Sequence, residues 1–138
     1  MTIELNNKTI RLLTLFENIT NVTVRDCFEN GKTVYFIVEE GKAGLAIGKG
    51  GNSIKHVENI IGKNIKVYEY SPDSINFIKN IIPMAKDIKI IEENGKTIAE
   101  VKVSKLDRGY VIGRGGEKIK IYKEILKRIH NISDLKVK

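Results

Sequence analysis

The sequence predicts an α+β protein made of two copies of one small unit, each a three-stranded sheet with helices on one face. Two observations indicate the duplication. Residues 46–55 (AIGKGGNSIK) reappear as residues 111–120 (VIGRGGEKIK), and Asn30-Gly31 reappears as Asn94-Gly95. The first pair is offset by 65 positions and the second by 64, and a nearly constant offset at two separate landmarks is typical of an internal repeat.

Turn chemistry at Ser71-Pro72 interrupts the pattern halfway along the chain. A chain of 138 residues suits one ordinary domain or two small ones. We therefore expect two domains, over residues 1–70 and 71–138.

In the first half, Asn7 is expected to cap a helix, because apolar residues recur at helical spacing after it. Asn30 and Gly31 tolerate the positive φ of a two-residue hairpin loop, and Gly62 is expected to end a later helix. The expected elements are a helix over 7–18, strands over 22–28 and 33–38, helices over 42–47 and 53–61, and a strand over 65–70.

The second half repeats this order. Ser71 is expected to cap its first helix, with Pro72 at the first helical position and Ile75, Ile78 and Ile82 on one face. Pro83 ends that helix. The later elements are strands over 88–92 and 97–103, a helical turn over 108–112, a helix over 117–130 and a strand over 134–137.

The chain carries a net charge of +7 and has a pI near 9.4. Lysine and arginine side chains that neutralise phosphates release condensed counterions, so a basic excess favours a polyanionic partner. A solvated basic surface explains the same charge, and composition alone does not separate the two interpretations.

The residue pattern argues against several classes of protein. No apolar run reaches the length of a membrane span, and residues 1–5 lack the basic-then-apolar order of a signal peptide. Cys27 is the only cysteine, so it forms no internal disulfide and no cysteine metal cluster, and we expect it in the core. We expect a cytoplasmic monomer without a membrane contact, a metal or a cofactor.

Gly48-Lys49-Gly50-Gly51 and Gly113-Arg114-Gly115-Gly116 each lie between two expected helices. Three glycines remove the Cβ atoms from a tight turn, so another backbone can approach closely. Each loop leads into a helix N-terminus, which favours an anion, and carries one cation at its tip. A tight turn between helices is the alternative for a single loop, but two copies with a cation in the same position favour binding of a phosphodiester backbone.

Other phosphate-binding motifs do not fit these loops. The Walker pattern Gly-x4-Gly-Lys-Ser/Thr is absent from the sequence. The dinucleotide fingerprint Gly-x-Gly-x-x-Gly would need glycine at Ser53 or Lys118 and a preceding strand instead of a helix.

No arrangement of residues predicts catalysis. His56 and His130 are single residues on expected helices, and solvated or packed histidines explain both. Asp26, Glu39 and Glu40 are expected on the surface. Because no nucleophile–base pair and no carboxylate pair stands out, we do not expect an enzyme.

Residues 47–54 and 112–119 resemble the Ile-Gly-x-x-Gly-x-x-Ile signature of KH domains, in which the Gly-x-x-Gly loop clamps four backbone nucleotides. The helix-first order resembles the type II KH fold. The resemblance therefore implies two tandem type II KH domains of order αββααβ. It also implies a nucleotide groove, with the loop and its two helices as one wall and the strands ending at Tyr70 and Val137 as the other.

The paired units further resemble the tandem KH segment of the NusA family of transcription elongation and termination factors, and a chain of two KH units is similar to its archaeal members. The resemblance implies that single-stranded RNA is the ligand and that the transcription machinery is a further partner, in elongation, termination or antitermination. Bacterial members add a polymerase-binding domain and an S1 domain. Neither fits in this chain, so direct contact with RNA polymerase stays open.

The apolar residues beside each loop would floor a groove for bases, although they also suit a core. Lys42, Lys105, Arg108 and Lys118 can line its phosphate side. The residues expected to bind RNA are Ile47, Gly48, Lys49, Gly50, Gly51, Ile54 and Lys55 in the first unit, and Ile112, Gly113, Arg114, Gly115, Gly116, Ile119 and Lys120 in the second. Two alternatives stay open: the same fold used in ribosome assembly or RNA decay, and a protein-interaction scaffold whose loops are only turns.

Overall fold

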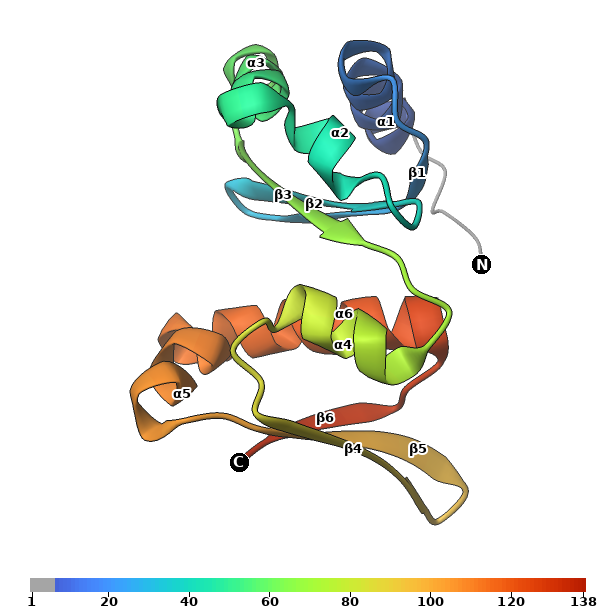
Figure 1. Cartoon of the computed structure of the whole chain (residues 1–138), viewed down its shortest axis with the longest axis vertical. Helices are drawn as coiled ribbons and strands as arrows, with labels where there is room; N and C mark the ends of the chain where they lie inside the picture. Colours follow the sequence, from blue (N-terminus) through green and yellow to red (C-terminus); the bar gives the residue numbers. More distant parts are fainter. Residues whose placement is uncertain (1–6) are drawn as a thin grey trace. The chain divides into compact units, whose positions relative to one another are not determined.

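The structure is a computed structural model that describes residues 7–138, and it contains the expected order of elements twice (Figure 1). The first set is α1 (Asn7–Thr20), β1 (Val24–Asn30), β2 (Thr33–Val38), α2 (Ala43–Ile47), α3 (Asn52–Ile61) and β3 (Asn64–Glu69). The second set is α4 (Ser74–Ile81), β4 (Asp87–Glu93), β5 (Lys96–Lys102), α5 (Lys105–Ile112), α6 (Glu117–His130) and β6 (Asp134–Val137). The glycine loops form short 3-10 turns, η1 (Lys49–Gly51) and η2 (Arg114–Gly116).

The α+β class with two three-stranded sheets is therefore confirmed. The chain divides into two compact units at the step from Ser71 to Pro72. Asn7 lies within α1 and not before it. The expectation for residues 1–5 lies outside the described residues.

In the first unit the sheet has the order β1-β2-β3, with β2 antiparallel to β1 and parallel to β3. Figure 1 shows α1, α2 and α3 on one face of this sheet. Successive side chains of a strand alternate between its faces, and Val34, Phe36 and Val38 of β2 belong to the buried core. The ring of Phe36 stacks on that of Phe16 from α1, with centroids 4.1 Å apart. This core supports the two helices that flank the first glycine loop.

The second unit has the same topology, with order β4-β5-β6 and a parallel pairing of β5 with β6. Figure 1 shows α4 and α6 on one face of its sheet. Val111 of α5 and Ile125 and Leu126 of α6 have no exposed surface. Both helices that flank the second loop are therefore anchored by buried apolar side chains.

The start and the buried face of α4 differ from expectation. Asp73 caps this helix instead of Ser71, and its carboxylate accepts a hydrogen bond from the Asn76 N–H at 3.4 Å. With the helix starting at Ser74, its apolar stripe excludes Ile75, which is exposed. The buried residues of α4 and its C-cap are Phe77, Ile78, Ile81 and Ile82.

The two hairpins use different loops. The second has the expected loop Asn94-Gly95, with positive φ at both residues (54° and 76°). In the first, Asn30 pairs with Thr33, so the loop is Gly31-Lys32 and the expected loop was wrong by one residue. Only Gly31 has a positive φ there, which matches a type II′ turn, whose first central residue is glycine.

An irregularity in β1 explains a second error. The pairing with β2 shifts register between Val24 and Asp26, which marks a β-bulge. A bulge redirects side chains, and Asp26, expected on the surface, is fully buried. One of its carboxylate oxygens accepts the N–H of Cys27 at 2.8 Å. Cys27 itself lies in the core, as expected.

Candidate nucleic-acid interface

The two glycine loops have nearly the same backbone conformation. Gly48 has φ 81° and ψ 168°, and Gly113 has φ 77° and ψ 170°. The next two glycines of each loop also have positive φ: 62° at Gly50, 63° at Gly115, 78° at Gly51 and 75° at Gly116. L residues with a side chain rarely adopt these angles, so the backbone conformation itself requires glycine at these positions.

The first glycine of each loop packs tightly against the helix that follows. A Cβ atom on Gly48 would lie 2.5 Å from the Ser53 hydroxyl oxygen and 2.9 Å from the Ser53 backbone nitrogen. A Cβ atom on Gly113 would lie 2.9 Å from the backbone nitrogen of Lys118. These glycines therefore have a structural role: they let the loop pass directly over the start of the next helix.

The middle glycine faces open space. A Cβ atom on Gly50 or Gly115 would meet no heavy atom within 4 Å. The neighbouring Lys49 and Arg114 are exposed. The outer side of each loop thus offers bare backbone next to a cation, which suits close approach of an anionic chain.

Backbone hydrogen bonds fix both loops in the same way. The Gly51 N–H donates to the Gly48 carbonyl at 3.1 Å, and the Gly116 N–H donates to the Gly113 carbonyl at 3.2 Å. Gly51 and Gly116 are the N-cap residues of α3 and α6, and neither provides a side-chain cap. The first turns of these helices therefore lack a capping side chain, and an anion can bind at such a terminus.

Different contacts hold the helices before the loops. The N-terminus of α2 is held by Glu69 of β3, whose carboxylate accepts the Ala43 N–H at 3.2 Å. In α5 the cap is Ser104, whose hydroxyl oxygen accepts the Asp107 N–H at 3.1 Å and whose O–H donates to the Asp107 carboxylate at 2.9 Å. The helix before each glycine loop therefore has an N-terminus held by a side-chain hydrogen bond.

The structure places the remaining predicted residues around the loops with unequal exposure. Lys55 and Lys120 are exposed, and Ile47 is 41% exposed. Ile54 is half-buried and packs against the core, so it is largely a structural residue. Ile112 and Ile119 are also half-buried.

Sequence reasoning missed two exposed side chains on the helices before the loops. Leu45 of α2 and Tyr110 of α5 are each 56% exposed. The same offset of 65 positions that relates the loops relates these two residues, so the repeat itself could have identified them. The Lys118 ammonium lies 3.3 Å from the centroid of the Tyr110 ring.

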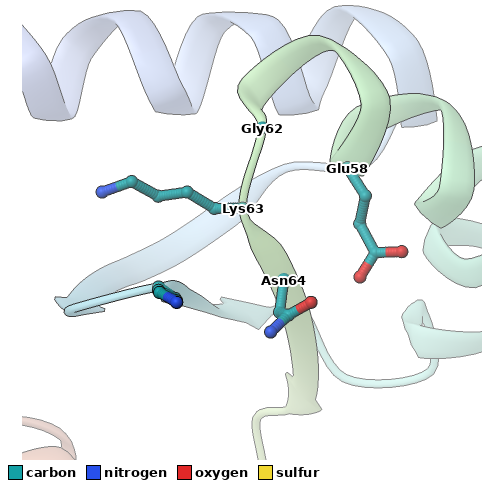
Figure 2. Close-up of a pocket in the computed structure, with 5 residues that line it drawn as sticks. Glu58, Gly62, Lys63 and Asn64 are labelled. Carbon is teal, nitrogen blue, oxygen red and sulfur yellow. The ribbon is translucent and has the colours of Figure 1, made fainter.

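A hollow of about 490 Å³ lies away from the first loop, at the C-terminal end of α3 (Figure 2). Figure 2 shows Lys63 extending from the segment that joins α3 to β3, with the Glu58 side chain descending from α3 on the other side of that segment. Glu58 accepts the Ile65 N–H at 2.9 Å, and Lys63 pairs with Glu29, which also pairs with Lys8 at 2.8 Å. Burial and the nearby Lys8 lower the pKa of Lys63. These polar groups are occupied by contacts within the first unit. The hollow is therefore not part of the candidate RNA-binding surface at the glycine loops.

Within residues 7–138, no three His, Cys, Asp or Glu side chains gather as a metal site would require. In the same range no helix is long and apolar enough to cross a membrane. His56 is exposed, and His130 lies beside Phe77, with ring centroids 5.2 Å apart.

Comparison with known proteins gives three findings. The family model described as KH domain matches residues 12–82, which span most of the first unit and α4. Proteins of Methanocaldococcus jannaschii and Halobacterium salinarum, both named probable transcription termination protein NusA, are 38% and 31% identical to the chain. The matches cover 98% and 99% of this chain, and 75% and 99% of those proteins. A solved structure, "Crystal structure of APE1850", is 34% identical, with a TM-score of 0.81 over 97% of this chain and 100% of that one.

Proposed function

The chain belongs to the family of KH-domain proteins, and from this we propose that it binds single-stranded RNA through both glycine loops as a factor of transcription elongation, termination or antitermination. Its two units, 1–70 and 71–138, are then tandem type II KH domains. The names of the archaeal relatives support the role in transcription, because those relatives match the chain over nearly its whole length.

One observation carries the proposal: the second loop has the backbone conformation of the first. The KH model matches residues 12–82 and so includes only the first loop. Gly113, Gly115 and Gly116 nevertheless have the dihedral angles of Gly48, Gly50 and Gly51 to within a few degrees. A conformation that only glycine adopts readily, present twice beside a cation, supports the same ligand for both loops.

The chemistry of each loop suits a nucleic-acid backbone. A phosphate can approach the open side of Gly50 or Gly115 because no side chain lies there. The uncapped first turn of α3 or α6 and the cation at Lys49 or Arg114 favour its negative charge. KH domains bind four nucleotides at such a loop.

The sheet supplies the other wall of each proposed groove. β3 and β6 are edge strands, so their outer N–H and C=O groups have no neighbouring strand within their sheets. With Ile47 exposed beside the first loop, bases have an apolar surface on one side and strand polar groups on the other. Splayed single-stranded bases suit such a groove better than a duplex does.

The test replaces both loop tips with acidic residues, as K49D, G50D, R114D and G115D in one chain. Both glycines have open space and left-handed φ, which aspartate tolerates better than most residues, so this loop variant should fold. We expect it to lose binding to a single-stranded RNA oligomer in fluorescence anisotropy, with an unchanged circular dichroism spectrum.

The hairpins provide a matched control. Gly31-Lys32 and Gly95-Lys96 also pair an open, positive-φ glycine with an exposed lysine. The variant G31D, K32D, G95D and K96D therefore makes the same change of net charge away from the proposed site. It should keep most of the RNA affinity. Equal affinities of the loop variant and the hairpin variant would refute the proposed function.

A further inference from the structure

An exposed aromatic ring lies beside the second glycine loop. Tyr110 is on α5, three residues before Gly113, and is 56% exposed. Lys118, in the first turn of α6, places its ammonium 3.3 Å from the ring centroid. The pair therefore joins the two helices that flank the loop, and this contact favours the observed position of the ring.

The lysine that contacts the ring also lies on the loop. The Cβ and Cγ atoms of Lys118 lie 3.0 Å and 2.9 Å from the position that a Cβ on Gly113 would occupy. Its stem passes directly over the first glycine of the loop. Tyr110, Lys118 and the proposed backbone clamp thus form one continuous surface.

The ring remains accessible to a planar ligand. An ammonium over one face of an aromatic ring leaves the other face for stacking, and more than half of the Tyr110 side chain is exposed. Leu106, four residues earlier on the same face of α5, is 94% exposed and extends the apolar surface. Every nucleobase has a π-face, so bases stack on such rings with little sequence dependence.

The first unit has no ring at the position equivalent to Tyr110. The offset of 65 positions relates Tyr110 to Leu45 and Lys118 to Ser53. Leu45 is equally exposed, but it is aliphatic, and the short Ser53 side chain packs under Gly48. A feature that contributes to binding in the second unit alone would make the two units unequal in base recognition.

We propose that Tyr110 is a base-stacking platform: the second loop holds the RNA backbone while one nucleobase stacks on the ring that Lys118 positions. This inference rests on the proposed function and adds to it a residue that contacts a base. Stacking discriminates only modestly between bases, so any preference of the second unit for a purine, whose π-face is larger, should be small.

The affinity test uses the full chain and an oligoadenylate of about 12 nucleotides, long enough for four nucleotides at each loop. Y110L copies the residue of the first unit, and Y110F keeps the ring. We expect Y110L to weaken binding by about tenfold, within the range measured for loss of a base–aromatic stack, and Y110F to bind like the unaltered chain. An oligomer with abasic sites should bind Y110L and the unaltered chain equally.

A fluorescence test gives an independent readout. The sequence contains no tryptophan, so Y110W introduces a single indole. Oligoadenylate should quench its emission, whereas the abasic oligomer should not. The matched variant L45W in the first unit reports what a ring at the equivalent position does without the lysine contact.

The outcomes separate this inference from the proposed function. If Y110L binds oligoadenylate like the unaltered chain while the loop variant loses binding, the stacking platform is wrong and the backbone clamp stands. If the loop variant binds normally, the proposed function fails and the platform with it. Quenching of Y110W by the abasic oligomer would also overturn the platform.

Discussion

Gly48 and Ser53 lie so close that a Cβ atom on the glycine would fall 2.5 Å from the serine hydroxyl oxygen. Gly50, two residues later, would place its Cβ in open space. The two glycines therefore have different roles, although both have a positive φ. Gly48 is needed for the fold of the loop, and Gly50 is available to the ligand.

The first prediction follows from this difference. G48A should lower the free energy of unfolding by about 2–4 kcal/mol, because overpacking adds to the backbone strain. G50A should lower the free energy of unfolding by about 1 kcal/mol, from the left-handed φ alone. Its loss of RNA-binding free energy should be larger than this loss of stability, because the added methyl group lies on the side that the ligand approaches. Urea denaturation of the two variants measures both values. Equal losses of stability would show that the contact with Ser53 does not constrain the loop.

The cap of α5 gives a second prediction. Ser104 accepts the Asp107 N–H, and S104A removes this acceptor. The variant should lose about 1 kcal/mol of stability, as for other N-caps, while S104T, which keeps the hydroxyl, should keep most of it. Thermal unfolding of both variants provides the comparison. Because α5 precedes the second loop, S104A should also weaken RNA binding at that loop. An S104A variant that unfolds at the same temperature as the unaltered chain would contradict the assignment of Ser104 as the cap.

A third prediction concerns acid. The Leu135 N–H, which donates to Asp134 at 2.8 Å, and then Lys123 and Lys136 hold the pKa of this carboxyl below its usual range. A carboxyl with a lowered pKa stabilises the folded state above its unfolded-state pKa, and this contribution is lost as the pH falls below about 4. D134N should therefore be less stable than the unaltered chain at neutral pH, by less than about 1 kcal/mol because the site is exposed. The difference should disappear near about pH 2, where the carboxyl is protonated in both the folded and the unfolded state. If D134N remained less stable than the unaltered chain at acid pH, the difference in stability would have a cause other than ionisation of Asp134.

The repeat made most of the fold predictable from the sequence. β2, α6 and β6 have the predicted bounds, because each is a strongly patterned segment between clear turn residues. The two glycine loops could be predicted because their motif occurs twice in the sequence. Gly48 and Gly113 belong to a motif whose spacing appears twice, and their positive φ follows from the residue type.

Most of the wrong predictions concern features that depend on contacts between residues far apart in the sequence. The bulge in β1 accompanies the burial of Asp26, and no local pattern marks a bulge. The hairpin loop is Gly31-Lys32 because Asn30 pairs with Thr33 across the sheet. The contact between Tyr110 and Lys118 joins residues on opposite sides of a loop, so only the folded chain reveals it. Asp73 replaced Ser71 as the cap because either residue suits that position and sequence does not rank them.

A fourth prediction separates transcription from the alternative processes. If the chain acts in transcription elongation or termination, RNA crosslinked to it in cells and then sequenced should come mainly from nascent transcripts, near their 3′ ends. The loop variant provides the background. Crosslinks dominated by ribosomal RNA would instead favour ribosome assembly with the same fold.

The dependence of RNA affinity on salt tests the central claim most directly, because phosphate contacts release counterions. For the unaltered chain the logarithm of the affinity should fall linearly with the logarithm of the salt concentration, with a slope of about −0.7 per phosphate contact on single-stranded RNA. The variant pairs K49D/G50D and R114D/G115D should each give a flatter slope and a weaker affinity, and their combination should remove nearly all binding. A loop variant with the slope and affinity of the unaltered chain would show that the glycine loops are turns and not backbone clamps.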